Sequence, residues 1–238
     1  MTKGEYVAAP WNFEAVAIGD AEALGPVKLD CKPDGLPRGA ALAFSNMGLV
    51  CVKRTAAANA ALGRAGSIIA RVPGLWSIVD RQVKRITIVR SAGECFDTSH
   101  SDPAWPGIVL VSIPPHGPVG DLRLGEGIIH EAMHHHLSAL EANMTLVREQ
   151  RPLHSPWRDT DRPAGGVLHG LFVFASVAHA LQKLIDLGSL GEDALRHARK
   201  RIGEIRGEIA SIDHGGLSTA LTARGRAIQK AACRAVEH

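Results

Sequence analysis

His130-Glu131-Ala132-Met133-His134, an HExxH pentad, is the stretch from which the fold and chemistry of this 238-residue chain are predicted. Residues four apart lie one turn apart on the same face of a helix, so the imidazoles of His130 and His134 can reach one divalent ion. Glu131 lies about 100° around that helix, where it can contact a metal-bound water or a polar group next to one of the metal ligands. The pentad predicts half of a metal site, with Glu131 as the catalytic residue.

The sequence around the pentad predicts a helix. Prolines and a glycine at 114–118 forbid helix upstream, and Asp121 is a candidate N-cap. Apolar residues then recur at helical spacing from Leu122 to Leu140. The pentad therefore lies in the middle of a helix.

Helical position also indicates the roles of three further residues near the pentad. His135 and His136 rotate progressively off the ligand face, which assigns them to packing or to solvent. Glu126 falls on the ligand face, four residues before His130. It is either a solvated acid or a partner of a ligating imidazole, and the spacing leaves both readings open.

Composition and charge indicate a globular protein that binds no nucleic acid. With 45% hydrophobic and 21% charged residues, the chain is long enough for one sizeable core, so a single domain over 1–238 is expected, with an irregular segment at about 1–37. The net charge of +3 is small. The one dense basic stretch, at 196–206, is typical of the wet face of a helix rather than of a nucleic-acid patch.

Cysteine usage and hydropathy predict a reduced, cytoplasmic protein without a membrane partner. No signal peptide opens the chain, and no run of about 18 uncharged apolar residues is present. None of the four cysteines forms a CxxC pair, so neither a zinc knuckle nor a disulfide framework is indicated. They are Cys31, Cys51, Cys95 and Cys233.

The remaining patterns predict a mainly α fold with a small antiparallel sheet, an α+β architecture. Alanine-rich sequence at 38–70 favours two helices. The β-branched stretches 85–90 and 107–113 are predicted to be strands that pair antiparallel directly before the metal helix. A proline-punctuated loop at 151–163 then leads into a long apolar helix at about 164–187.

Two more helices are expected near the end of the chain. Between 192 and 212, apolar residues three and four apart form a seam that packs against the core or against a second copy of the chain. Core packing is favoured, and a homo-oligomer is left open. The sequence Asp213-His214-Gly215-Gly216 breaks this helix, and a last helix runs from about 218 to 236.

A catalytic ion needs a third protein ligand, and His169 is the favoured candidate. It lies near the start of the apolar helix, on a face shared with core side chains, although a core histidine bonded to a carbonyl would have the same pattern. The metal site is therefore predicted between the HExxH helix and this downstream helix. The downstream candidates considered are His154, Asp159, Asp161, His169 and His179.

Two blocks of sequence resemble a known family. They are LGEGIIHEAMH at 124–134 and SPWRDTDRPAGGVLHG at 155–170, preceded by the strand PGIVLVS at 106–112. Together they resemble the HExxH-motif peptide-modification family, whose members occur with ribosomally synthesised and post-translationally modified peptides (RiPPs), alone or fused to radical-enzyme maturases. The resemblance covers roughly residues 85–185, and the two blocks together are far more specific than the pentad alone.

The resemblance implies a metal-dependent oxidoreductase that tailors a precursor peptide. Some members are understood as iron(II)/2-oxoglutarate-dependent dioxygenases that hydroxylate a peptide side chain at its β-carbon. Fused relatives often carry glutamine where this chain has His169. Most non-haem iron oxygenases use two histidines and one carboxylate, so a three-histidine set is a variant, and Glu131 is the alternative third ligand.

Two arginines of the second block fit an iron(II)/2-oxoglutarate site. The distal carboxylate of 2-oxoglutarate is best held by a planar guanidinium, for which Arg158 and Arg162 are the candidates. The alternative is that they pair with Asp159 or Asp161. Trp157, directly before Arg158, is predicted to anchor the loop on the core rather than to serve as a platform for the substrate.

The competing predictions are a zinc metallopeptidase and a non-catalytic peptide-binding domain. In a zinc peptidase the pentad supplies two ligands and a glutamate that activates an ion-bound water. This chain lacks the HExxHxxGxxH continuation of one large peptidase group, which counts against that reading. A binding domain would hold a leader peptide without turnover.

Overall fold

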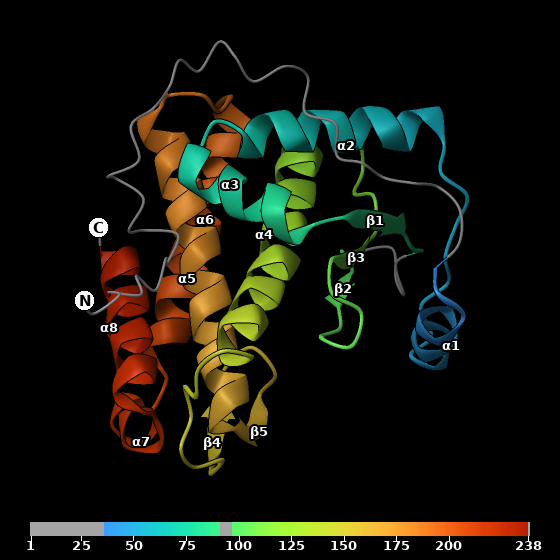
Figure 1. The fold of residues 1–238 in the computed structure, drawn as a ribbon. Coiled ribbons are helices and arrows are strands. Elements are labelled where there is room, and N and C mark those ends of the chain that lie inside the picture. The colour runs from blue at the N-terminus through green and yellow to red at the C-terminus, as the bar shows by residue number, and fades with distance from the viewer. Residues whose placement is uncertain (1–35, 91–96, 238) are drawn as a thin grey trace, which may run out of the picture.

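A computed structural model of the chain describes residues 36–90 and 97–237, and long helices form its core (Figure 1). Helix α5 (Ala164–Asp186) lies at the centre and packs against α4 (Pro118–Glu141), α6 (Glu192–Ala210) and α8 (Ala223–Glu237). Because neighbours surround α5, apolar residues occupy most of its circumference. The predicted mainly α fold with a small sheet is confirmed, while the metal site between α4 and α5 stays a prediction.

The sequence expectation that no apolar run reaches the length of a membrane span is wrong, because helix α5 is the one described helix long and apolar enough to cross a membrane. Two thirds (67%) of its most apolar window is buried inside the fold, as in the core helix of a soluble protein. The seam of α6 also faces inward, since Ala198, Ile202 and Ile205 are buried in the main core. Core packing of this seam is confirmed, while the cytoplasmic location stays a prediction.

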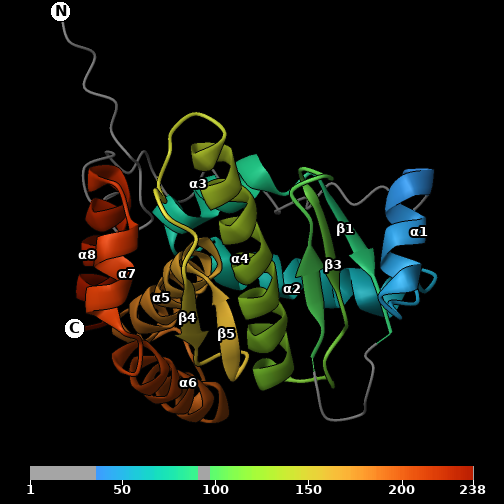
Figure 2. The same cartoon turned by 90° about the horizontal axis from the view of Figure 1, so that it is seen from below.

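A three-stranded sheet lies beside α4, on the side away from α5 (Figure 2). Its order is β1 (Arg85–Ile88), β3 (Ile108–Val111) and β2 (Ser99–Ser101). The expected antiparallel pairing of the two β-branched strands is wrong: β1 runs parallel to β3, and β2 pairs antiparallel with β3 on its other side. The long connection between β1 and β3 lets the chain return to the starting end of the sheet, which a parallel pair requires.

The other face of the sheet is covered by α1 (Arg38–Asn46), which packs Ala40 and Phe44 against Ile108 and Leu110.

Helix α2 (Ala56–Ile69) crosses above α4, and α3 (Pro73–Gln82) follows it (Figure 1). The two helices predicted within 38–70 are therefore confirmed.

Helix α4 begins earlier than expected. It starts at Pro118, after Gly117 in a left-handed conformation (φ 131°), because proline fits the first helical position without losing a hydrogen bond. Asp121 is therefore not the N-cap. It lies in the first turn of α4, where its carboxylate accepts a hydrogen bond from Arg64 Nε of α2 at 2.7 Å.

The segment predicted as a proline-punctuated loop is a hairpin of β4 (Pro152–Ser155) and β5 (Thr160–Pro163). The two prolines form the terminal pair of its register, where a missing N–H disturbs the ladder least. The last predicted helix is split into α7 (His214–Ala220) and α8, and Asp213 caps α7 by accepting from Gly216 N at 2.9 Å.

Part of the sequence predictions lies outside the described residues. The irregular segment at about 1–37 falls almost wholly there, as do Cys31 and Cys95. Cys51 and Cys233 are free thiols. The sheet, α4, α5 and the hairpin, which position the predicted site, are all described.

Candidate metal centre

The three predicted histidine ligands line one cavity of about 670 Å³. His130 and His134 enter it from α4, with ring centroids 4.9 Å apart, and His169 enters from α5. The rings of His134 and His169 stack, 5.5 Å apart and inclined by 17°. The β4–β5 hairpin supplies the facing wall, so helices far apart in the sequence meet as predicted.

His134 and His169 are spaced like two ligands of one ion. Their Nδ1 atoms are 3.3 Å apart. Two nitrogens that each lie about 2.0–2.1 Å from an ion, at a tetrahedral angle, are about 3.3 Å from one another. The distance between these two nitrogens therefore matches that of two ligands of one ion. Within residues 36–90 and 97–237, however, no three histidine, cysteine, aspartate or glutamate side chains form a group that could hold an ion, so the three-histidine site stays a prediction.

The imidazoles of His130 and His134 are neutral at pH 7, which is the form that binds metal. Burial and, to a smaller extent, the positive charges of Arg201 and Arg158 together lower the pKa of His130 to about 4. Burial also lowers the pKa of His134 to about 2, together with the neighbouring histidines. His130 and His134 can therefore each donate a lone pair to a metal ion without first losing a proton.

His169 has a carboxylate partner that the sequence reading missed. Its Nε2 lies 2.8 Å from Oε2 of Glu141, the last residue of α4. Glu141 follows His134 by seven residues, which on a helix brings it back to nearly the same face. That spacing was a signal that could have pointed to Glu141.

Glu131 lies away from the histidine cavity. The residue is 3% exposed, and its two oxygens accept hydrogen bonds from Ser99 Oγ at 2.7 Å and Ser101 Oγ at 2.5 Å. Burial raises the pKa of Glu131, although the two hydroxyls and the charge of Arg158 oppose that rise. The cavity lining does not include it, so its predicted catalytic role stays a prediction. Nothing in the sequence singled out the two serines of β2.

Arg158 and Arg162 both line the cavity, from the turn and from β5 of the hairpin. In the described part of the chain neither forms an ion pair with Asp159 or Asp161, and Asp159 instead lies 3.8 Å from His154. The alternative that the arginines only brace the hairpin is therefore not realised. Since Arg158 contributes to the low pKa of His130, its charge acts on the side of the cavity that holds His130.

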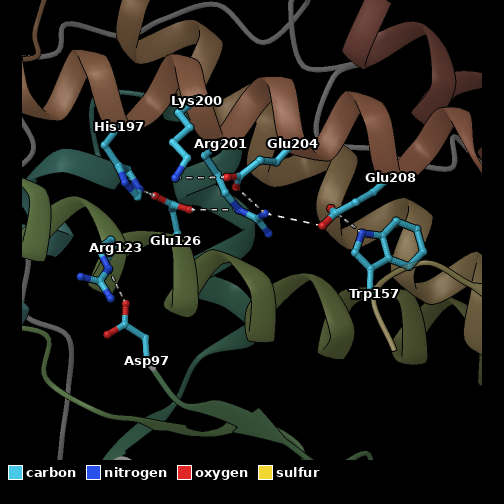
Figure 3. A network of polar contacts seen from close by, with 9 residues as sticks. All are labelled: Asp97, Arg123, Glu126, Trp157, His197, Lys200, Arg201, Glu204 and Glu208. Atoms are coloured by element: carbon cyan, nitrogen blue, oxygen red, sulfur yellow. Dashed lines mark hydrogen bonds and ion pairs between the residues drawn. The ribbon is translucent and has the colours of Figure 1, made fainter. Parts of the chain in front are cut away.

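Trp157 anchors the hairpin turn on the core, as predicted. Its indole stacks on Phe174 of α5, 4.9 Å away and inclined by 13°, and its Nε1 donates to Glu208 Oε2 at 2.9 Å (Figure 3). Only a glycine at 170 permits this approach, because a Cβ there would lie 2.4 Å from an indole carbon. Phe174 also contacts His130, with ring centroids 5.0 Å apart.

Two residues near the pentad, His135 and Glu126, contact other elements of the fold rather than the histidine cavity. His135 is buried and its Nε2 lies 3.1 Å from the carbonyl of Ile108, which confirms its assignment to packing. Glu126 lies 2.8 Å from His197 Nε2 and 3.9 Å from Arg201 Nε of α6 (Figure 3). Glu126 is thus neither a solvated acid nor a partner of a predicted ligand, and it joins α4 to α6.

Comparison with models of known protein families finds no match for this chain, and a search of curated proteins also finds none. The function is therefore proposed from the residues of the cavity and from the motif resemblance.

Proposed function

We propose that this protein is a metal-dependent tailoring enzyme that hydroxylates a side chain of a ribosomal precursor peptide, using iron(II), 2-oxoglutarate and oxygen. One observation carries the proposal: a single cavity combines the three histidines with two arginines that, among the described residues, have no carboxylate partner. A metal end and an anion-binding end in one cavity match a cosubstrate that has a keto-acid and a distal carboxylate.

The roles of the residues follow from their positions. His134 and His169 hold the ion through nitrogens already at ligand spacing, and His130 is the third ligand. Arg158, which lines the same cavity as the three histidines, holds the distal carboxylate. When held by these residues, iron(II) and 2-oxoglutarate would supply oxygenase chemistry, in which one atom of dioxygen enters a substrate C–H bond and the other enters succinate as 2-oxoglutarate loses carbon dioxide.

The hairpin and α5 give the cavity a size and an apolar wall suited to this reaction. A volume of about 670 Å³ lies in the range of small-molecule sites. Phe174 and Trp157 form one continuous aromatic surface beside His130, and this surface keeps water from that side of the ion. The peptide side chain would approach over the remaining opening.

The zinc peptidase is the second candidate, and the position of Glu131 counts against it. A peptidase glutamate must reach the water on the ion to act as its base. Here both oxygens of Glu131 are bonded to Ser99 and Ser101, and the side chain lies outside the cavity. The hydroxylase is therefore favoured.

The test is reconstitution with iron(II) under anaerobic conditions, followed by addition of oxygen, 2-oxoglutarate and the precursor peptide encoded beside this gene. We expect a mass gain of one oxygen atom per modified residue, dependent on 2-oxoglutarate. His169→Ala should abolish the gain, whereas His154→Ala, on the exposed hairpin, should not. Peptide cleavage with zinc and no cosubstrate would refute hydroxylation in favour of the peptidase. Binding without turnover under either condition would leave only the peptide-binding domain.

A further inference from the structure

Both nitrogens of the His169 imidazole have a neighbour. Nε2 lies 2.8 Å from a carboxylate oxygen of Glu141, and Nδ1 lies 3.3 Å from Nδ1 of His134. The side chains of His169 and Glu141 are partly buried, 19% and 32% exposed. The contact thus lies at the rim of the cavity and joins the end of α4 to the beginning of α5.

A carboxylate can only accept, so this contact fixes where the proton of His169 resides. Nε2 must carry it and donate to Glu141, which leaves the lone pair on Nδ1, the nitrogen that faces His134. A neutral histidine that lacks such a partner can take either tautomer. Glu141 thereby selects the tautomer that a shared ion requires.

We propose that Glu141 is a positioning residue of the metal centre, which holds His169 so that it ligates through Nδ1. This inference rests on the proposed metal site, and extends it to a residue outside both the pentad and the arginine block. Hydrogen bonds from ligating histidines to carboxylates orient the ring and make the ligand nitrogen more basic. The chain therefore has a glutamate seven residues after the last histidine of its HExxH pentad, and this glutamate contacts His169.

The test compares Glu141→Gln with the wild type and with Glu149→Gln, a matched change at an exposed carboxylate that lies 3.5 Å from Arg151. The first readout is the dissociation constant for cobalt(II) or zinc(II) alone, measured by competition with a chromophoric chelator. We expect Glu141→Gln to weaken binding by about 10- to 100-fold while keeping one ion per chain. Glu149→Gln should leave the constant unchanged.

The second readout is the tautomer of His169 in the metal-free protein, from long-range proton–nitrogen NMR. The wild type should carry its proton on Nε2, and Glu141→Gln should mix the tautomers, because an amide can donate or accept. An unchanged metal affinity in Glu141→Gln would overturn the inference. Complete loss of the ion from a folded variant would also overturn it, since Glu141 would then be a ligand itself.

The two readouts separate this inference from the function on which it rests. If the wild type binds no metal, the proposed function fails, and the NMR measurement still decides whether Glu141 sets the tautomer. If the metal binds and the tautomer does not depend on Glu141, the proposed function stands and the positioning role fails.

Discussion

Replacing Gly170 with alanine should displace Trp157 and loosen the hairpin that carries Arg158. The added methyl carbon would lie 2.4 and 2.5 Å from two carbons of the indole, far inside van der Waals contact. Gly170 lies within α5, whose backbone is packed on several sides, so the indole rather than the helix must move. The change therefore tests whether the glycine exists to admit the tryptophan.

The magnitude follows from what the indole loses. Its hydrogen bond to the Glu208 carboxylate contributes about 1.5–3 kcal/mol, and its stack on Phe174 about 0.5–1.5 kcal/mol beyond area burial. Alanine recovers about 1 kcal/mol over glycine within a helix. We expect a net loss of about 1–3 kcal/mol in the free energy of unfolding, since the displaced indole keeps part of its contacts.

Urea unfolding measures this free energy, and Gly203→Ala is the control. Gly203 lies on α6 with nothing within 4 Å of an added Cβ, so alanine there should stabilise by about 1 kcal/mol. A double-mutant cycle with Trp157→Ala should show that most of the loss disappears when the indole is absent. If Gly170→Ala proves as stable as Gly203→Ala, or if the loss persists without Trp157, the reasoning is refuted.

Three further outcomes are expected. Arg158→Leu should raise the 2-oxoglutarate concentration needed for half-maximal rate by tenfold or more, a loss of about 1.4 kcal/mol, while metal affinity changes little; equal loss of both would contradict its assignment. Glu131→Gln should keep the metal in titrations, because the amide can still bond Ser99 and Ser101, whereas loss of the ion would make Glu131 a ligand. In EDTA, urea unfolding should show stability falling as pH drops below about 6.5 toward 4, since His130 stays neutral when folded and protonates when unfolded; His130→Gln should flatten this dependence.

Local patterns predicted the parts of the site that depend on a single helix. The pentad fixes the direction of His130 and His134 because helical geometry is set by sequence spacing alone. His169 was predicted as a ligand because its spacing on one apolar helix puts it on a face shared with core side chains. The cavity then brings these residues together, and Arg158 joins them from the hairpin turn.

The features that sequence reasoning missed depend on long-range topology. Neither strand near the pentad indicates whether it pairs with the next strand or with a later one, so the parallel pairing of β1 and β3 and the position of β2 could not be read from periodicity. The β4–β5 hairpin was predicted as a loop because its sequence contains prolines, but these form the terminal pair of the two strands. The partners of Glu131 depend on β2, and they were missed for the same reason.

The position of β2 shows why an HExxH pentad does not by itself specify hydrolysis. A helix presents the middle glutamate about 100° away from the two histidines, so its surroundings depend on which element packs there. In this fold the sheet lies on that side, and Ser99 and Ser101 bond the carboxylate of Glu131 between α4 and β2. Removing either hydroxyl would leave a buried carboxylate oxygen unbonded, at a cost of about 1–3 kcal/mol or more. The glutamate that a peptidase would use on water thus joins helix to sheet here, and in the proposed function the histidines and the arginines of the hairpin carry the chemistry of the cavity.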